Sequence, residues 1–329
     1  MRCESCVRGS GDFQAAAFFC VASICACAGN VLRADEPAPA WREQVGFSFG
    51  HRATEAAFSP DGKTLAIVGG DYDDTGIVKL FDVATHQERL SLDGHNGQVN
   101  AVAFSPDGKT LATGGGAGPG LGEIKLWDIA GGKLLLSLSP QGGYVLALAF
   151  SPDGKTLAAG AGHIDNDRYF GEAGFWDVAS GQKLPLALEG AKGEVTALSY
   201  VAGGKQLVTS GSRFDEASGR NVCEVKLWDA ADGGEQAVLF TSVGPDVDAV
   251  FFEMRALAVS ADGKRIAGAG RDASQGDDAV RCGCGASTRA PTGAFSAMRK
   301  RPSSFARRSL ATAKRWPSAA STMRFISGT

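Results

Sequence analysis

The chain has 329 residues and a formal net charge of −3 at pH 7, and a chain of this length can bury a sizeable core. The charge is uneven, because residues 281–329 carry ten basic side chains and no acidic one, which leaves −13 on residues 1–280. A body this acidic disfavours binding to the phosphate backbone of nucleic acids. Of the eight cysteines, only Cys223 lies between residues 30 and 280, so the cysteine pattern predicts no disulfide framework.

Residues 1–34 have the features of an export signal. Arg2 and Arg8 precede an apolar run over residues 15–28, and residues 26–28 form a small-x-small triplet suited to cleavage. The apolar run is too short to span a bilayer, so no membrane span is expected. We expect an exported protein, periplasmic or secreted, with a disordered leader on a cytoplasmic protein as the alternative. Residues 35–41 then form a Pro-rich linker.

A ten-residue phrase, Ala-Phe-Ser-Pro-Asp-Gly-Lys-Thr-Leu-Ala, occurs three times, at Ala57–Ala66, Ala103–Ala112 and Ala149–Ala158. Each copy begins 46 residues after the last. A fixed period of about 40 to 50 residues is typical of a repeat architecture. Ser-Pro-Asp-Gly favours a tight turn, because Pro presets φ, Asp bonds to nearby backbone and Gly adopts a left-handed conformation. Since apolar runs flank each turn, every copy predicts a β-hairpin.

A second phrase follows each copy at a similar distance. It reads apolar-Lys-Leu-aromatic-Asp at residues 78–82, 124–128 and 225–229, and it is shortened to Phe-Trp-Asp at 175–177. Together the two phrases resemble the WD-repeat family of β-propellers over residues 42–280. The resemblance implies an all-β fold in which four-stranded antiparallel blades surround a central channel.

The repeats place the blades along the chain. We expect four full blades near residues 53–92, 98–138, 144–187 and 194–241, and part of a fifth at 256–280. By resemblance, the orphan strand at 42–50 completes the final blade and closes the ring. Closure removes exposed sheet edges, so a closed ring would favour a monomer.

The resemblance also implies a hydrogen-bond network inside each blade. In the family it joins a Gly-His before the first strand, a Ser or Thr in the second, an Asp in the loop between the second and third strands, and the Trp. The matching positions, to which we assign structural roles, are His51, His95, Trp127, Trp176 and Trp228. In the first blade Phe81 replaces the Trp and cannot donate a hydrogen bond.

Residues 281–329 break the pattern and are expected to be irregular or disordered. One interpretation is a basic arm for an acidic partner. We favour another, that a shifted reading frame encodes this tail, because permitted codons for residues 306–329 read in another frame give the hairpin phrase and the Trp-Asp strand. Sequencing the gene across the codons for residues 278–284 tests this interpretation.

Candidate binding residues lie in the connections between second and third strands, at 69–76, 114–122, 160–172, 211–223 and 269–277. Polar loops on a rigid scaffold often carry binding sites, although Asp is also ordinary turn chemistry. The candidates are Asp71, Asp73, Asp74, His163, Asp165, Asp167, Asp215 and Glu216. Asp71, Asp73 and Thr75 also resemble the opening of a calcium loop. Asp82 stands where that motif needs Glu, so no metal is assigned.

Two classes of function remain. The first is a non-catalytic scaffold that binds another protein through its loop face, because repeat architectures supply surfaces rather than catalytic groups. The alternative is an exported propeller enzyme, or a sensor that binds a ligand or calcium in the central funnel. No cofactor is expected.

Overall fold

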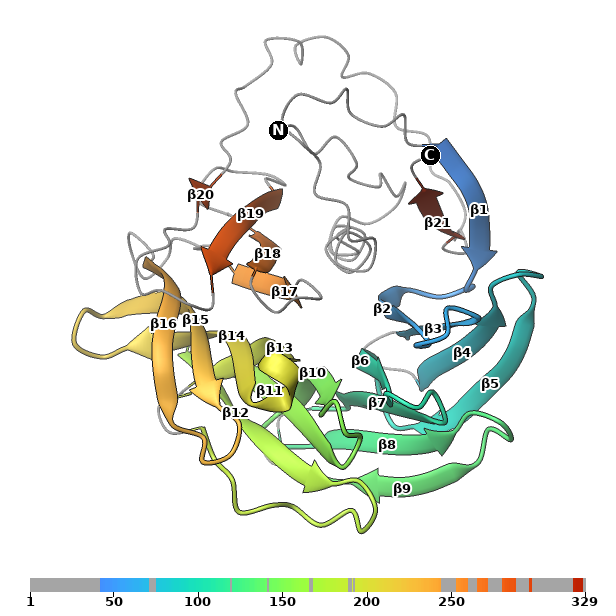
Figure 1. Cartoon of the computed structure of the whole chain (residues 1–329), viewed down its shortest axis with the longest axis horizontal. Coiled ribbons are helices and arrows are strands. Elements are labelled where there is room, and N and C mark those ends of the chain that lie inside the picture. Colours follow the sequence, from blue (N-terminus) through green and yellow to red (C-terminus); the bar gives the residue numbers. More distant parts are fainter. Residues whose placement is uncertain are drawn as a thin grey trace, which may run out of the picture.

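The structure, a computed structural model, describes residues 42–70, 75–118, 120–140, 142–165, 168–188, 191, 193–243, 253–259, 265–271, 280–287, 296–297 and 322–327. In this part of the chain the fold is all-β, as the sequence predicts, apart from one 3-10 turn, η1 (Ala202–Gly204). The sheets are antiparallel and follow one another around a centre, with their first strands innermost (Figure 1). No helix within the described ranges is long and apolar enough to cross a bilayer.

Blades 1, 2 and 4 are four-stranded sheets in chain order. Blade 1 contains β2 (Ala53–Phe58), β3 (Thr64–Gly69), β4 (Gly76–Asp82) and β5 (Glu88–His95). Blade 2 contains β6 (Val99–Phe104), β7 (Thr110–Gly116), β8 (Gly122–Asp128) and β9 (Leu134–Leu138). Blade 4 contains β13 (Glu194–Val201), β14 (Gln206–Asp215), β15 (Arg220–Asp229) and β16 (Glu235–Val243). Strands β5, β9 and β16 lie at the rim (Figure 1).

Blade 3 differs from the expected four strands. It contains β10 (Tyr144–Phe150), β11 (Thr156–Asp165) and β12 (Arg168–Asp177). The following segment pairs with β12 through the Trp176–Lys183 bridge, flanked by hydrogen bonds from Asp177 N to Gln182 O at 2.9 Å and from Leu184 N to Phe175 O at 2.8 Å. Pro185 comes next and has no N–H to continue the ladder, so the fourth strand does not form among the described residues.

The ends of the described chain also form sheets. Blade 5 contains β17 (Glu253–Val259), β18 (Arg265–Arg271), β19 (Val280–Ser287) and β20 (Ser296–Ala297). The orphan strand β1 (Arg42–Ser48) pairs antiparallel with β21 (Thr322–Ser327). We expected residues 281–329 to be irregular, whereas β19 pairs with β18, β20 pairs with β19 and β21 pairs with β1. The leader at 1–34, the linker and the rest of the tail lie outside the described residues.

The Ser-Pro-Asp-Gly turns have the geometry that their sequence predicts. In the first, Ser59 Oγ donates to Asp61 Oδ1 at 2.7 Å, Thr64 N donates to Ser59 Oγ at 2.9 Å, and Gly62 has a φ of 70°. The hydrogen bond from Ser59, followed by that from Lys63 N, lowers the pKa of Asp61. The turns at Ser105 and Ser151 repeat these bonds, so each hairpin is fixed locally.

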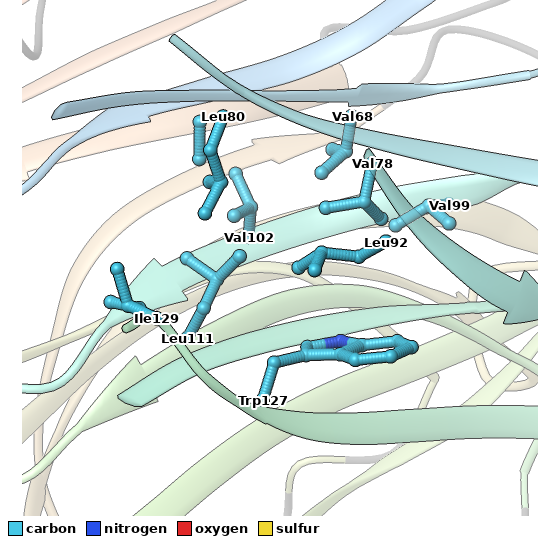
Figure 2. Close-up of a cluster of buried hydrophobic side chains, with 10 residues drawn as sticks. Val68, Val78, Leu80, Leu92, Val99, Val102, Leu111, Trp127 and Ile129 are labelled. Atoms are coloured by element: carbon cyan, nitrogen blue, oxygen red, sulfur yellow. The ribbon is translucent and has the colours of Figure 1, made fainter. Parts of the chain in front are cut away.

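Apolar side chains fill the space between neighbouring sheets. Between blades 1 and 2, Val78, Leu92 and Val102 pack against Leu111 and Trp127 (Figure 2). Equivalent clusters lie between β1 and blade 1 and between each later pair of blades. Because blades 1 to 4 each bury both faces against their neighbours, these sheets form a rigid support for the connections at their ends.

Candidate interaction face

Two β-hairpins project from the ends of blades 3 and 4 at the connections between second and third strands. Strands β11 and β12, and strands β14 and β15, are each ten residues long, against six or seven for β3, β4, β7 and β8. We expected loops at 160–172 and 211–223, but most of these residues continue the strands. Residues 163–170 contain β-branched and aromatic side chains around Asn166 and Asp167, a pattern that suits a hairpin.

The blade 3 hairpin carries an exposed aromatic side chain on a fixed support. The His163 ring stacks on Phe170 with 5.4 Å between centroids and 20° between planes. His163 Nδ1 lies 3.2 Å from Gly142 O, so it donates to the connection between blades 2 and 3. Phe170 remains 43% exposed. The sequence candidate His163 therefore holds an aromatic side chain in place.

A second exposed apolar side chain lies on the same face. Leu121, in the turn before β8, is 63% exposed. The next residue, Gly122, closely approaches Gly143 O in the connection that His163 also contacts. We use the name hairpin face for the β11–β12 and β14–β15 hairpins together with the β7–β8 turn.

The blade 4 hairpin ends in a polar, internally bonded tip. Asp215 Oδ2 accepts hydrogen bonds from Ser218 Oγ at 2.6 Å and from Ser218 N at 3.1 Å. Arg213 contacts Asp215 at 3.1 Å and Glu224 at 3.2 Å. The bond from Ser218, and then that from Arg213, lowers the pKa of Asp215. Asp215 therefore caps the turn, while Glu216 beside it is exposed.

The other sequence candidates are less well defined. Asp71, Asp73, Asp74 and Asp167 lie outside the described residues. Asp165 is the last residue of β11, and only its backbone is described. Thr75 precedes β4 and is exposed. Within the described ranges, no group of three or more His, Cys, Asp or Glu residues is placed to hold a metal ion.

A complete hydrogen-bond network joins the last residue of β5, in blade 1, to strands β7 and β8 of blade 2. His95, Thr113 and Trp127 are 1%, 0% and 3% exposed. Trp127 Nε1 donates to Thr113 Oγ1 at 2.8 Å, and His95 Nε2 lies 2.7 Å from the same oxygen. His95 Nδ1 lies 3.0 Å from Glu123 Oε2, which must accept. Thr113 Oγ1 thus lies within hydrogen-bond distance of both Trp127 Nε1 and His95 Nε2, and the network joins strands β5, β7 and β8.

Glu123, which the sequence analysis did not single out, completes that network. Burial opposes ionisation of Glu123, but hydrogen bonds from His95, Lys125 and Asn96 N outweigh it and lower its pKa to about 2. Glu123 is the second residue of β8, one position after the loop in which the family resemblance implies an Asp.

Blade 4 retains only part of the network. Trp228 Nε1 donates to Thr209 Oγ1 at 2.8 Å, but Ala191 stands where blade 2 has His95, as the pairing of Val195 with Gly211 and of Val99 with Gly115 shows. A cavity of about 30 Å³ opens there, lined by Ala191, Thr209, Arg213, Glu224, Lys226, Trp228 and neighbouring residues. Arg213 binds the Glu224 carboxylate that an imidazole would contact.

The remaining assigned residues depart from the expected network. His51 is exposed and lies edge-on to Phe49 at 6.3 Å, because blade 1 has Ile67 and Phe81 where blade 2 has Thr113 and Trp127. The assigned role of His51 in a blade 1 network is therefore not seen. Trp176 is buried, but Ala159 stands at the position equivalent to Thr113 and has no hydroxyl to accept from it.

A buried carboxyl group joins the inner strands of blades 1 and 2. Glu55 on β2 accepts a hydrogen bond from Val102 N on β6 at 2.7 Å. Burial raises the pKa of Glu55 to about 7, partly offset by this bond. The equivalent residues in blades 2, 3 and 4 are Ala101, Ala147 and Ala197. A superposition of the repeats would have singled out Glu55, but not its partner.

Comparisons with known proteins agree with this architecture. A family model described as "WD domain, G-beta repeat" matches residues 86–128 and 132–168. The β-propeller domain of Cps50 (Swd1) from Myceliophteria thermophila aligns with a TM-score of 0.55 and 18% identity, over 79% of this chain and 75% of that one. Hydrazine synthase from Kuenenia stuttgartiensis aligns with a TM-score of 0.54 and 18% identity, over 78% of this chain.

The chain spans only 65% of that hydrazine synthase chain. At 18% identity both structural likenesses show the fold alone. No curated protein matches the sequence.

Proposed function

Because the chain belongs to the WD40-repeat β-propeller family, we propose that it is a non-catalytic scaffold that binds another protein through the hairpin face. One observation carries the proposal. Phe170 is 43% exposed yet held by stacking on His163. A large aromatic side chain with little remaining freedom binds a partner at low entropic cost, and such residues dominate interface energies.

The surroundings of Phe170 support an interface. Leu121 adds a second exposed apolar side chain on the same face. Arg213 adds a guanidinium that is 30% exposed and oriented by Asp215 and Glu224. Aromatic and Arg anchors inside a polar rim are typical of protein–protein interfaces. The acidic charge of residues 1–280 favours a basic partner, because complementary charge accelerates association.

The experiment is affinity capture of partners by the tagged chain. We expect Phe170→Ser or Leu121→Ser to weaken capture of a specific protein, and the triple variant Leu121→Ser, Phe170→Ser, Arg213→Ser to abolish it. Phe58→Ser is the matched control, because Phe58 is 45% exposed but precedes a Ser-Pro-Asp-Gly turn at the opposite end of blade 1. Equal capture by the triple variant and the native chain would refute the proposal.

We also propose that the scaffold acts outside the cytoplasm. The support is the sequence of residues 1–34, in which Arg2 and Arg8 precede an apolar run and a small-x-small triplet. The expected partner is then an exported or envelope protein. An enzyme or sensor, the alternative function, would instead lose its activity or ligand through one substitution on the hairpin face.

A further inference from the structure

Blade 3 leaves one side of its last strand without a ladder partner in the described part of the chain. The sheet order is β10-β11-β12, and the backbone of the next segment pairs with β12 near its C-terminal end, at residues 175–177. In blade 4 the equivalent strand β15 is paired from Val222 to Trp228 by β16. Blade 3 therefore has the same extended hairpin as blade 4 without its covering strand (Figure 1).

The burial of equivalent residues shows the effect of that difference. The Leu157–Trp176 pair of blade 3 is equivalent to the Leu207–Trp228 pair of blade 4. Counting back from each Trp, Phe170 and Gly171 of β12 correspond to Val222 and Cys223 of β15. Val222 and Cys223 are 4% and 0% exposed, whereas Phe170 is 43% exposed and Gly171 is half-buried. A strand covers this position in blade 4, whereas in blade 3 Phe170 is open to solvent. Ala173, three residues further along β12, is buried at 9% exposed in a cluster with Leu188.

We propose that the outer edge of β12, from Phe170 to Ala173, binds an extended segment of a partner protein as an added antiparallel strand. The inference rests on the proposed scaffold function and names the chemistry of its partner. Strand addition takes affinity from main-chain hydrogen bonds and specificity from alternate side chains. Strand β16 provides the template, since Phe240–Val243 oppose Val222–Val225 in blade 4.

The direction of the backbone groups follows from the bonds already made. Phe175 O points outward, because it accepts from Leu184 N. Backbone direction alternates along a strand, and β11 and β12 pair without a bulge. The N–H and C=O groups of Gly171 and Ala173 therefore also point outward. The partner residues opposite these two would exchange main-chain hydrogen bonds with them.

The side chains of β12 define the rest of the recognition. Phe170 and Glu172 lie two residues apart on the same face of the strand. Opposite an added strand they would form the non-hydrogen-bonded pairs, in which facing side chains approach most closely. Glu172 pairs with Lys183 at 2.9 Å, but both side chains are nearly half exposed, at 44% and 48%, so a partner can displace this pair. The fitting segment has Lys or Arg opposite Glu172 and an aromatic residue opposite Phe170, in the order basic-x-aromatic.

The experiment uses the full chain and a labelled peptide, acetyl-Thr-Lys-Thr-Phe-Val-amide, whose binding is followed by fluorescence anisotropy. N-methylation of either Thr, which removes a donor facing β12, should weaken binding at least tenfold. N-methylation of the Lys or the Phe, whose N–H groups point away, should leave it within twofold. No binding at millimolar peptide, or equal effects of the two kinds of methylation, would overturn the inference.

Side-chain variants complete the test. Glu172→Lys should weaken the peptide at least fivefold, and exchanging the peptide Lys for Glu should restore binding to that variant. Phe170→Ala should weaken it similarly, and Phe58→Ala is the control that should not. Leu121→Ser should leave peptide binding intact. If the peptide does not bind while the chain still captures its partner protein, this inference is wrong and the proposed scaffold function stands. Sedimentation that shows self-association lost on Glu172→Lys would assign the edge to a second copy and contradict a separate partner.

Discussion

The hydrogen-bond network around Thr113 gives the sharpest stability prediction, which concerns the substitution Thr113→Val. The hydroxyl of Thr113 serves both Trp127 Nε1 at 2.8 Å and His95 Nε2 at 2.7 Å, and all three residues are at most 3% exposed. Valine is similar in shape but leaves both ring nitrogens buried without a partner. Each unsatisfied group costs about 1–3 kcal/mol, so we expect a loss of roughly 2–5 kcal/mol.

Thr209→Val in blade 4 is the matched comparison. Its hydroxyl serves only Trp228 Nε1 in the network, and the cavity of about 30 Å³ beside it is large enough to admit water. We expect a loss near 1 kcal/mol. Equilibrium urea denaturation followed by tryptophan fluorescence measures both variants. A loss for Thr209→Val equal to or greater than that for Thr113→Val would refute the reasoning.

Three further predictions follow from the same structure. Ala191→His should fill the blade 4 cavity, supply Thr209 with a partner and raise the free energy of unfolding by about 1 kcal/mol; a loss of stability in urea would show that Arg213 already uses that space. Burial raises the pKa of Glu55 in the folded chain to about 7 from the ordinary Glu value of 4.5, so its contribution to stability is full below about pH 4.5 and is lost as the pH rises through 7. Glu55→Gln should flatten this dependence and, after allowance for partial exposure, stabilise the chain by roughly 2 kcal/mol at pH 8; an unchanged pH profile would contradict it. Residues 1–34 fused to a reporter active only outside the cytoplasm should give activity that Arg2→Glu with Arg8→Glu reduces severalfold, and an inactive fusion would favour a cytoplasmic protein.

The hairpins were predictable because their chemistry is local. Ser59, Asp61 and Gly62 bond to one another within a few residues, so the turn can be read from its own sequence. The order of the sheets followed from repetition of these turns at a fixed spacing. The all-β fold and its division into radial sheets could therefore be predicted before any packing was known.

The hairpin face could be located but not described in detail. Residues 163–170 looked like a polar loop around Asn166 and Asp167, although strand pairing carries β11 to Asp165. The stacking of His163 on Phe170 depends on a hydrogen bond to Gly142, twenty-one residues earlier. Such contacts depend on how neighbouring blades are placed, which a single repeat does not encode.

The open edge of blade 3 had a visible signal in the sequence. Pro185 stands where the outer strand of a blade should continue, and a proline cannot donate to the ladder. The significance of that residue appears only when blade 3 is compared with blade 4, where β16 pairs with the equivalent strand. The cavity beside Ala191 similarly required the register of two sheets to be matched.

The most direct test of the account is hydrogen–deuterium exchange of the chain with and without its captured partner. The account predicts slower exchange in the hairpins at residues 160–165, 168–172 and 213–223, with no change at the Ser59–Thr64 turn at the opposite end of blade 1. Protection confined to the Ser-Pro-Asp-Gly turns, or no protection in either hairpin, would contradict the claim that these hairpins form the binding surface.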